Sequence, residues 1–417
     1  MKKIFFAIII CLVTLNQTKA NTVDNNELLK IIYYSTIEFV ETPLSYIKGS
    51  VPLKSDVALN RNHYRFSYNW ENRLVSIAFY NGSTPKNPNH TANLFTLAHR
   101  MEFSYEDSIE KVTFFNTKGK QITVLGDCSQ FVFNLNQLGF RESLHFEDNS
   151  GKRVKNSWNI FEYKWEYLND GVIIEDRFDT NGKPVSIRPG FEFYRLKLYF
   201  NNAGHIALMQ NIDKDGNLVA NNSGASQDNI TTNSNGNFLQ WQVLDNQHQL
   251  EKGNGPDVAI GIQKFNEFGY EIELEHRDEN NQPIYSAYGI CRSKTQFDKY
   301  GNISERTFYN EVNEPSYHKN AGYHKLKIVW DKFGNNRELF SYFDVNEKPT
   351  NHIIRGYHAV KYEYDEKKNL IRISYLDTNG QLVNRKDNGI SYLTYQYDSN
   401  GKRSSTLKFD KEGKTLN

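Results

Sequence analysis

The sequence predicts an all-β fold, in which about ten antiparallel β-hairpin repeats of roughly 33 residues form one curved or spiral sheet. Turn motifs built on Asp or Asn and Gly return at a nearly constant spacing along most of the 417 residues. The runs between these turns alternate apolar and polar residues, as strands do. Aromatic residues make up 14% of the chain and favour strands over helices.

The glycine of the first turn marks each copy of the repeat, with spacings of 32 to 34 residues. One position carries Lys368 in place of glycine, and two looser copies precede the others around Asn72 and Ser108. The array is therefore expected to fill residues 61–417. The marking glycines are Gly139, Gly171, Gly204, Gly236, Gly269, Gly301, Gly334 and Gly401.

One copy shows why this pattern predicts a hairpin. Residues 357–364 (YHAVKYEY) and 369–376 (NLIRISYL) are runs of equal length on either side of the turn DEKK. Asp or Asn opens such a turn because its side chain accepts hydrogen bonds from nearby backbone N–H groups, and Gly closes it because the last position needs a positive φ. A second turn of the same kind follows each hairpin, as at Asp179, Asp213, Asp377 and Asp410.

Two structural features recur around the hairpins. A glycine before the first strand predicts a bend between units, at Gly190, Gly289, Gly322, Gly356 and Gly389. The residue before the first turn is large in nearly every copy, Thr232 being the exception. Since a single hairpin cannot bury its apolar face alone, stacked copies are expected to bury it against one another.

The N-terminal part lacks the repeat. Residues 1–20 have a basic start, an apolar run and a small residue at the expected cleavage site, which predicts a secretory signal peptide. The protein is therefore expected to be exported, whether it is periplasmic, on the cell surface or secreted. Residues 21–60 are expected to form a helical cap, because Asp24 and Glu27 have capping-box spacing and Leu28, Ile31 and Phe39 lie on one helical face.

Residues 220–235 (ANNSGASQDNITTNSN) are strongly polar and precede the poorest copy of the repeat. We expect them to form a mobile polar insertion in the array.

Two cysteines follow the expected signal peptide. Cys128 and Cys291 stand 163 residues apart, close to five periods, and each is the second residue after a glycine. They would occupy equivalent places five units apart, and disulfide Cα atoms must lie within about 7 Å. In a gently curved array two free thiols are therefore expected, whereas a tight spiral with about five units per turn would let them bridge.

The repeated turn, an aromatic residue followed by Asp-x-x-Gly, a strand and a second Gly turn, resembles the YD repeats of the RHS family. It is also similar in character to bacterial MORN-like repeats. The resemblance covers nearly all of the chain after the expected signal peptide. It implies a spiral β-sheet, which in the RHS family forms a shell around a toxin or other cargo.

Two groups of residues have the spacing of metal ligands. Asn211, Asp213, Asp215 and Gly216 begin like a calcium loop, but Asn222 stands where the bidentate acid is required. Cys291, His324 and His358 share one column of the repeat, and a stack of such columns could bind zinc. The hairpin turns and the strand entrances explain the same residues without a metal, so no metal, cofactor or catalytic residue is expected.

Charge and hydropathy argue against nucleic-acid binding and against a membrane-spanning segment. The formal net charge is +1 with no block of like charge, so nucleic acid is not expected. No segment after the signal holds about 18 consecutive apolar residues, so no membrane span is expected. The favoured function is a non-enzymatic exported protein that presents an extended surface to a cell-envelope polysaccharide or a protein partner. The alternative is a hydrolase with a site near residues 220–235.

Overall fold

The computed structural model describes residues 28–88, 98–168, 171–399 and 403–416. The expected signal peptide at 1–20 and the turn glycine Gly401 lie outside these ranges. Within them the chain forms 27 strands and one short helix, α1 (Ser55–Ala58). No described helix is long and apolar enough to cross a membrane.

The strands of the first half are β1 (Leu28–Ile37), β2 (Gly49–Leu53), β3 (Asn62–Asn69), β4 (Leu74–Asn81), β5 (Thr84–Pro85), β6 (Arg100–Glu106), β7 (Ile109–Phe115), β8 (Gln130–Leu135), β9 (Arg141–Glu147), β10 (Arg153–Val154), β11 (Glu162–Tyr167), β12 (Ile173–Phe178), β13 (Arg195–Phe200) and β14 (Ile206–Asn211). Those of the second half are β15 (Gln227–Thr232), β16 (Phe238–Leu244), β17 (Ile260–Phe265), β18 (Glu271–Arg277), β19 (Arg292–Phe297), β20 (Ile303–Tyr309), β21 (Lys325–Trp330), β22 (Arg337–Phe343), β23 (Ala359–Tyr364), β24 (Leu370–Leu376), β25 (Tyr392–Tyr397), β26 (Arg403–Phe409) and β27 (Thr415–Leu416).

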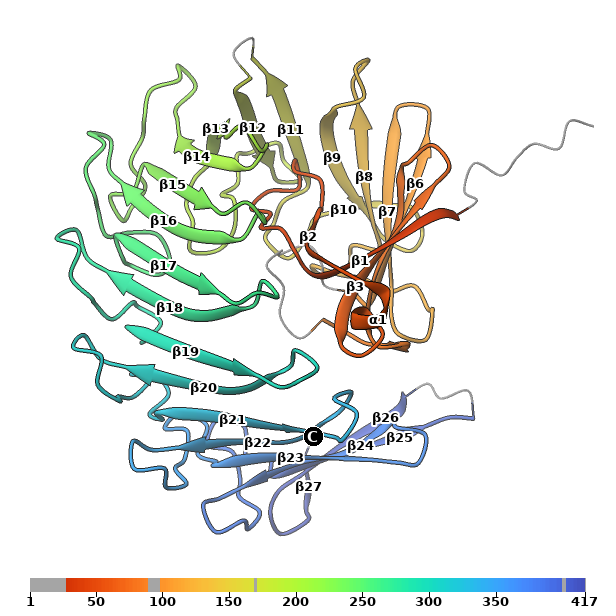
Figure 1. Ribbon diagram of the computed structural model, residues 1–417, viewed down its shortest axis with the longest axis vertical. Coiled ribbons are helices and arrows are strands. Elements are labelled where there is room, and N and C mark those ends of the chain that lie inside the picture. The colour runs from red at the N-terminus through yellow and green to blue at the C-terminus, as the bar shows by residue number, and fades with distance from the viewer. Residues whose placement is uncertain (1–27, 89–97, 169–170, 400–402, 417) are drawn as a thin grey trace, which may run out of the picture.

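All strands belong to one antiparallel sheet, in which the long strands are arranged largely in the order of the sequence. From β3 onward each long strand pairs with the previous and the next long strand, and β1 pairs with both β2 and β3. The sheet curves from β6–β9 over β11–β16 to β21–β27, around the N-terminal strands (Figure 1). The all-β prediction of a curved hairpin array is confirmed.

The turn chemistry predicted from the sequence is present. In the turn between β21 and β22, Asp331 Oδ1 accepts hydrogen bonds from the backbone N–H groups of Phe333 and Asn335 at 3.1 and 2.9 Å. Gly334 closes this turn with φ +70°, and Lys368 adopts φ 63° where it replaces glycine. The second turns use the same device, since Asp179 Oδ1 accepts from the N–H groups of Asn181 and Lys183 at 2.8 and 2.9 Å.

The large residue before the first turn has a structural role in joining units. In several hairpins the strand register shifts at this residue, as between Glu363 and Tyr364, which marks a β-bulge. The Tyr364 hydroxyl then donates to the Arg337 carbonyl of the preceding hairpin at 2.9 Å. Equivalent bonds to the preceding hairpin, between 2.8 and 2.9 Å, are made by Tyr167, Trp330 and Tyr397.

The run after the second turn does not form a third full strand in most units. It makes an isolated bridge instead, for example between Phe343 and Pro349 or between Leu376 and Leu382. These segments turn away toward the next unit after a single paired residue, so a unit has two long strands.

The predicted N-terminal helical cap at residues 21–60 is wrong for its described part. Residues from Leu28 to Ile37 form β1, whose partners include Ser67 and Phe66 of β3, and α1 is only 4 residues long. The segment KIIYYSTI is rich in β-branched and aromatic residues, which favour strands. Pairing with β3 satisfies its backbone, so the tertiary contact overrides the local helical pattern.

The predicted polar insertion at residues 220–235 is also wrong. Residues from Gln227 to Thr232 form β15, paired with β14 and β16 like the other repeats. Asn221 caps the turn before it, accepting from Ser223 N at 2.9 Å and Ala225 N at 3.2 Å. The sheet accommodates this polar strand because its buried side chains are hydrogen-bonded: Asp228 accepts from Asn254, and Gln227 donates to the Asp245 carbonyl.

The first strands lie across the tips of distant hairpins. Asn62 N donates to the Tyr300 carbonyl at 2.8 Å, and Asn81 Nδ2 donates to the Phe333 carbonyl at 2.7 Å. The buried Lys86 ammonium donates to the Gly334 carbonyl at 2.6 Å and lies 4.7 Å from the Trp330 ring centroid. The array is therefore held by contacts between distant units as well as between neighbours.

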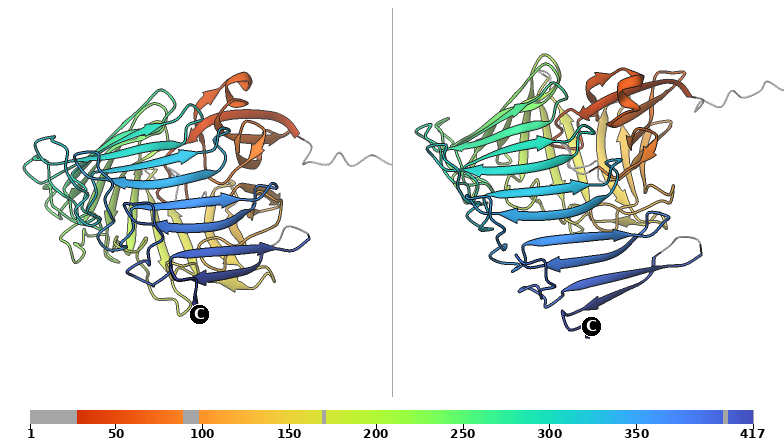
Figure 2. Two further views of the ribbon diagram at one scale, coloured as in Figure 1. Left: turned by 90° about the horizontal axis from the view of Figure 1, so that it is seen from below. Right: turned by 60° about the horizontal axis from the view of Figure 1, so that its bottom comes forward.

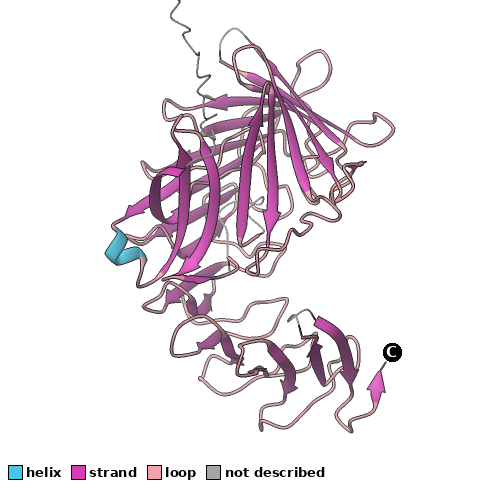
Figure 3. Ribbon diagram, turned by 90° about the vertical axis from the view of Figure 1, so that its right-hand side faces the viewer, coloured by secondary structure: helices cyan, strands magenta, loops and turns pink. Residues whose placement is uncertain are grey.

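The last hairpins return beneath the first part of the sheet (Figure 2). Lys118, in the turn after β7, has its Nζ 5.7 Å from the Tyr397 ring centroid of β25. Figure 3 shows from the side the C-terminal end of the sheet, which lies apart from the short helix α1. Cys128 and Cys291 are both buried and free, as expected for a gently winding array.

Candidate functional site: a pocket on the concave face

The concave face is filled by two separate apolar cores. The larger runs from Ile37 to Val243, and the smaller runs from Phe308 to Tyr375. Between them the inner side of β15–β20 encloses a cavity of about 390 Å³. Ligand pockets of proteins have this order of size and combine apolar walls with a few polar groups.

Aromatic rings form one wall of the cavity. Phe39 and Phe238 are stacked with centroids 4.2 Å apart, and Phe238 is stacked on Trp241 at 5.6 Å. The indole of Trp241 lies flat on Gly261 of β17, where a Cβ atom would come within 1.9 Å of the indole ring. Gly261 therefore permits the flat orientation of this ring. On the other side Tyr270 and Phe297 are stacked at 4.8 Å.

One end of the cavity carries a buried polar group of three residues. Arg188 forms an ion pair with Glu41, and the nearly buried Asp228 accepts a hydrogen bond from Asn254 Nδ2 at 3.0 Å. Burial raises the pKa of Asp228 to about 7, although the Arg188 charge opposes this shift. Burial also lowers the pKa of Arg188 to about 10. This end therefore offers both a guanidinium and a carboxyl group that is partly protonated near neutral pH.

The other end has a second carboxyl group. Glu271 Oε2 accepts a hydrogen bond from Gln263 Nε2 at 2.8 Å, and Arg306 lines the cavity beside them. Burial raises the pKa of Glu271 above its usual value, with Arg306 acting in the opposite direction. Each carboxyl group thus has an arginine nearby, so the cavity is polar at both ends without a strong net charge.

An N-terminal loop closes the cavity from inside the sheet. Residues 38–48 connect β1 to β2, and Glu38 N donates to the Lys48 carbonyl at 2.9 Å at the base of the loop. Phe39 and Glu41 of this loop line the cavity, and Phe39 N donates to the Gly236 carbonyl at 3.0 Å. The loop is a compact Ω-loop whose position depends on contacts with distant strands.

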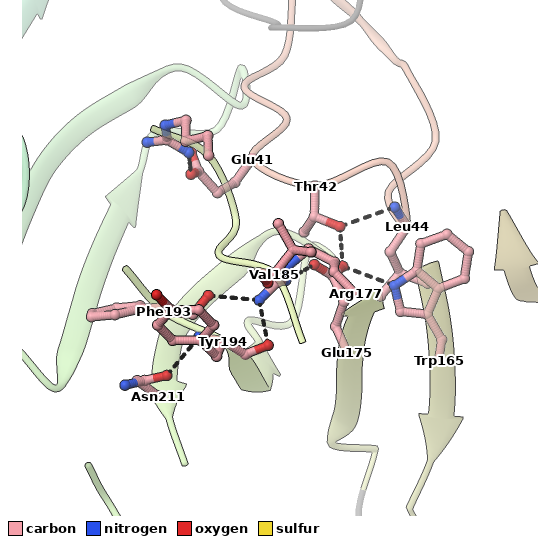
Figure 4. A network of polar contacts seen from close by, with 11 residues as sticks. Glu41, Thr42, Leu44, Trp165, Glu175, Arg177, Val185, Phe193, Tyr194 and Asn211 are labelled. Carbon is pink, nitrogen blue, oxygen red and sulfur yellow. Dashed lines mark hydrogen bonds and ion pairs between the residues drawn. The ribbon is translucent and has the colours of Figure 1, made fainter. Parts of the chain in front are cut away.

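Buried polar contacts hold the loop in place (Figure 4). The Thr42 hydroxyl donates to Glu175, which also accepts from Trp165 Nε1 at 2.8 Å and pairs with Arg177. Arg177 is fully buried and donates to the Phe193 and Tyr194 carbonyls at 2.8 and 3.0 Å. The charges are thus compensated, as buried charges must be.

Another arginine, Arg141, binds the backbone of the 38–48 loop directly. Arg141 Nη1 donates to the Pro43 carbonyl at 2.7 Å and to the Ser45 carbonyl at 3.2 Å, while its Nε donates to Glu110 at 3.1 Å. The loop therefore forms a fixed wall of the pocket.

The residues with metal-ligand spacing make other contacts. Asp213 caps its turn, accepting from Asp215 N and Asn217 N, both at 2.9 Å. His324 and His358 have their Nδ1 atoms 2.9 and 3.2 Å from the Ser316 and Thr350 carbonyls. No group of three or more potential ligands gathers in the part of the chain that the structure describes.

The pocket residues could not be identified from the sequence. They come from segments as distant as Glu41 and Arg306, and most of them resemble the strand aromatics and turn residues of every other repeat. Two signals were present: the polar run that contains Asp228, and a glycine, Gly261, in the middle of a strand, where glycine often marks a close approach of another group.

The comparisons with known proteins concern the fold only. No family model and no curated protein matches the chain. Among solved structures, TcdB2-TccC3-TEV is 9% identical with a TM-score of 0.27, covering 83% of this chain and 19% of that chain. The Photorhabdus luminescens Tc holotoxin pore is 11% identical with a TM-score of 0.24, covering 83% of this chain and 19% of that chain.

A porin-like protein from Bacteroides uniformis is 10% identical with a TM-score of 0.20, covering 74% of this chain and 94% of that chain. The chain spans about a fifth of the length of the toxin chains that it matches. Tc toxin structures are among the similar ones, and no family model of YD repeats matches the chain, so the expected RHS resemblance stays a prediction. At these TM-scores the similarities carry no argument about function.

Proposed function

We propose that this chain is an exported, non-enzymatic scaffold whose concave pocket binds a sugar unit of a cell-envelope polysaccharide. The observation that carries the proposal is the Trp241 ring, held flat on Gly261 beside Phe238 in a cavity with polar groups at both ends. Sugar rings present C–H faces that pack on aromatic rings, while their hydroxyl groups bond to amide, carboxyl and guanidinium groups.

The polar groups are placed for such a ligand. Arg188 and Asp228 at one end, with Gln263, Glu271 and Arg306 at the other, supply both donors and acceptors. Since each carboxyl group has an arginine nearby, the pocket favours a polar ligand of low net charge. Export is part of this proposal and rests on the apolar segment in residues 1–20.

Titration calorimetry with defined peptidoglycan and other envelope oligosaccharides tests the proposal. Trp241→Ala should weaken binding at least about tenfold, which corresponds to about 1.4 kcal/mol. Gly261→Ala should do the same by displacing the indole. Trp70, which is 51% exposed in the turn after β3, is the matched control, and Trp70→Ala should bind normally. Unchanged affinity of Trp241→Ala would refute the site.

A protein partner is the other ligand class for this scaffold. The wild-type chain would capture such a protein in a pull-down from an envelope extract. The capture would persist after the extract had been digested with glycan hydrolases. Capture that survives this treatment, without oligosaccharide binding in calorimetry, would replace the glycan by a protein ligand.

A hydrolase is the second candidate function. Two observations favour it: Asp228 and Glu271 line the same cavity, and burial raises the pKa of both. A carboxyl group that stays protonated near neutral pH is suited to general acid catalysis. Release of reducing ends from envelope polysaccharides that stops in both Asp228→Asn and Glu271→Gln, with binding retained, would support hydrolysis over binding alone.

A further inference from the structure

A second hollow lies on the outer face of the first hairpins. The outer face is the side of β3, β4, β6 and β7 opposite the larger apolar core. There a groove of about 450 Å³ runs over Arg65, Ser67, Ser76, Ala78, Arg100 and Thr113. Its floor consists of small side chains, whereas Phe66, Ile77 and Met101 on the reverse side of the same strands are buried in the core.

The strand register places two arginines on either side of one alanine. Ala78 of β4 pairs with Arg65 of β3 and with Arg100 of β6. Adjacent strands lie about 4.8 Å apart, so the Cα atoms of Arg65 and Arg100 lie about 10 Å from each other, with Ala78 midway between them. The short side chain of Ala78 is buried at the floor of the groove, between the two arginines. Ser76, two residues earlier on the same face, adds a hydroxyl group to the floor.

The guanidinium groups retain unused hydrogen-bond donors. Arg65 has no carboxylate within ion-pair distance among the described residues and lies 5.9 Å from the Tyr80 ring centroid. Arg100 Nη2 pairs with Glu102 at 3.1 Å, but its Nε is buried without a partner. Arg100 also lies 4.7 Å from the Phe115 ring centroid. The rings orient both arginines, and the groove carries two positive charges against the single charge of Glu102.

A comparable groove farther along the sheet has most of its cationic side chains paired with carboxylates. Over β17–β19 the outer face has a hollow of about 300 Å³ whose lining includes four cationic residues and the carboxylates of Glu273 and Glu275. Lys264 pairs with Glu273 at 2.6 Å, and Glu275 pairs with both Arg277 and Arg292 at 2.6 and 3.0 Å. Both guanidinium groups of that hollow are ion-paired, whereas Arg65 in the first groove has no ion pair among the described residues.

We propose that the groove between Arg65 and Arg100 binds an oxyanion, either a carboxylate or a phosphate group. Arginine presents planar pairs of donors that match carboxylate and phosphate oxygens, and two arginines across Ala78 can hold one such group from both sides. The hydroxyl of Ser76 supplies a further donor from below. This site is separate from the concave pocket and does not depend on the function proposed for it.

Calorimetric or NMR titration with glucuronate, glucose 6-phosphate and glucose tests the site at low salt. One or both anionic sugars should bind, and which of them binds identifies the source of the oxyanion. Neutral glucose should not bind to this groove. Arg65→Gln and Arg100→Gln should each weaken the binding at least tenfold. Ala78→Leu should do the same by filling the space without changing any charge.

Lys264→Gln, in the groove over β17–β19, is the matched control and should leave binding unchanged. Far-UV circular dichroism verifies the fold of each variant, and the two arginine variants carry the test if Ala78→Leu does not fold. The proposal is overturned if neither anion binds at millimolar concentration, if Lys264→Gln weakens binding as much as Arg65→Gln, or if a folded Ala78→Leu binds normally.

Discussion

Valine substitutions at Gly334 and at Gly139 together separate the cost of a left-handed backbone conformation from the cost of a steric clash with the preceding unit. Gly334 has φ +70°, and a Cβ atom there would lie 2.3 Å from Tyr300 Cδ2 of the preceding unit. Gly139 occupies the equivalent place between β8 and β9 with φ +81°, but a Cβ atom there would meet nothing within 4 Å. The two substitutions therefore share the backbone strain and differ in the steric clash.

The structure gives the expected magnitudes. A residue with a Cβ atom in the left-handed region costs about 1–2 kcal/mol, which is the full expected effect of Gly139→Val. A side chain forced into an occupied space adds about 1–3 kcal/mol. Gly334→Val should therefore lower the free energy of unfolding by about 2–5 kcal/mol. It also disturbs the carbonyl that accepts the Lys86 ammonium, which lies in the first part of the sheet.

Urea unfolding followed by far-UV circular dichroism measures both variants against the wild type. Gly334→Val should lower the midpoint clearly more than Gly139→Val. Equal shifts would show that the tip of this hairpin does not pack as the structure has it. An unchanged midpoint in both variants would show that the turns do not require a positive φ.

Three further outcomes are expected. Tyr364→Phe should lower the free energy of unfolding by about 1 kcal/mol in urea titration, because it removes the hydroxyl that donates to Arg337. The pKa of Asp228 is about 7 in the folded protein and about 3.8 in the unfolded chain, so the free energy of unfolding should fall as pH rises between these values. Asp228→Asn should make the melting temperature depend less on pH over the same range. Cys128 and Cys291 are buried and have pKa values raised to about 12 and about 11, so thiol reagents at neutral pH should label both only after denaturation without reductant.

Local chemistry explains which parts of the fold were predictable. Asp331 and Gly334 form their turn through contacts within five residues, so the sequence pattern alone predicts the hairpin. The recurrence of Tyr364 and its equivalents indicated a structural role, but the bond to the preceding hairpin required the register of the strands. A local pattern misled at β1, because the apolar spacing that suggested one face of a helix lies in a strand from Leu28 onward.

The candidate sites depend on packing between distant segments. Glu41 meets Arg188 only because the loop after β1 turns into the concave face, and no local pattern records that path. Arg65 and Arg100 flank Ala78 only through the register of three strands. Neither juxtaposition follows from spacing along the chain.

The sequence by itself determined the repeat, the hairpins and the all-β architecture, because turns and alternating strands are set by interactions between residues close in the chain. Only the tertiary structure decided that β1 is a strand, that residues 227–232 belong to the sheet as β15, and that a pocket lies between two apolar cores. The physical reason is that these features arise from curvature and from contacts over more than 100 residues, such as Thr42 with Glu175 and Asn62 with Asn302, which a local pattern cannot specify.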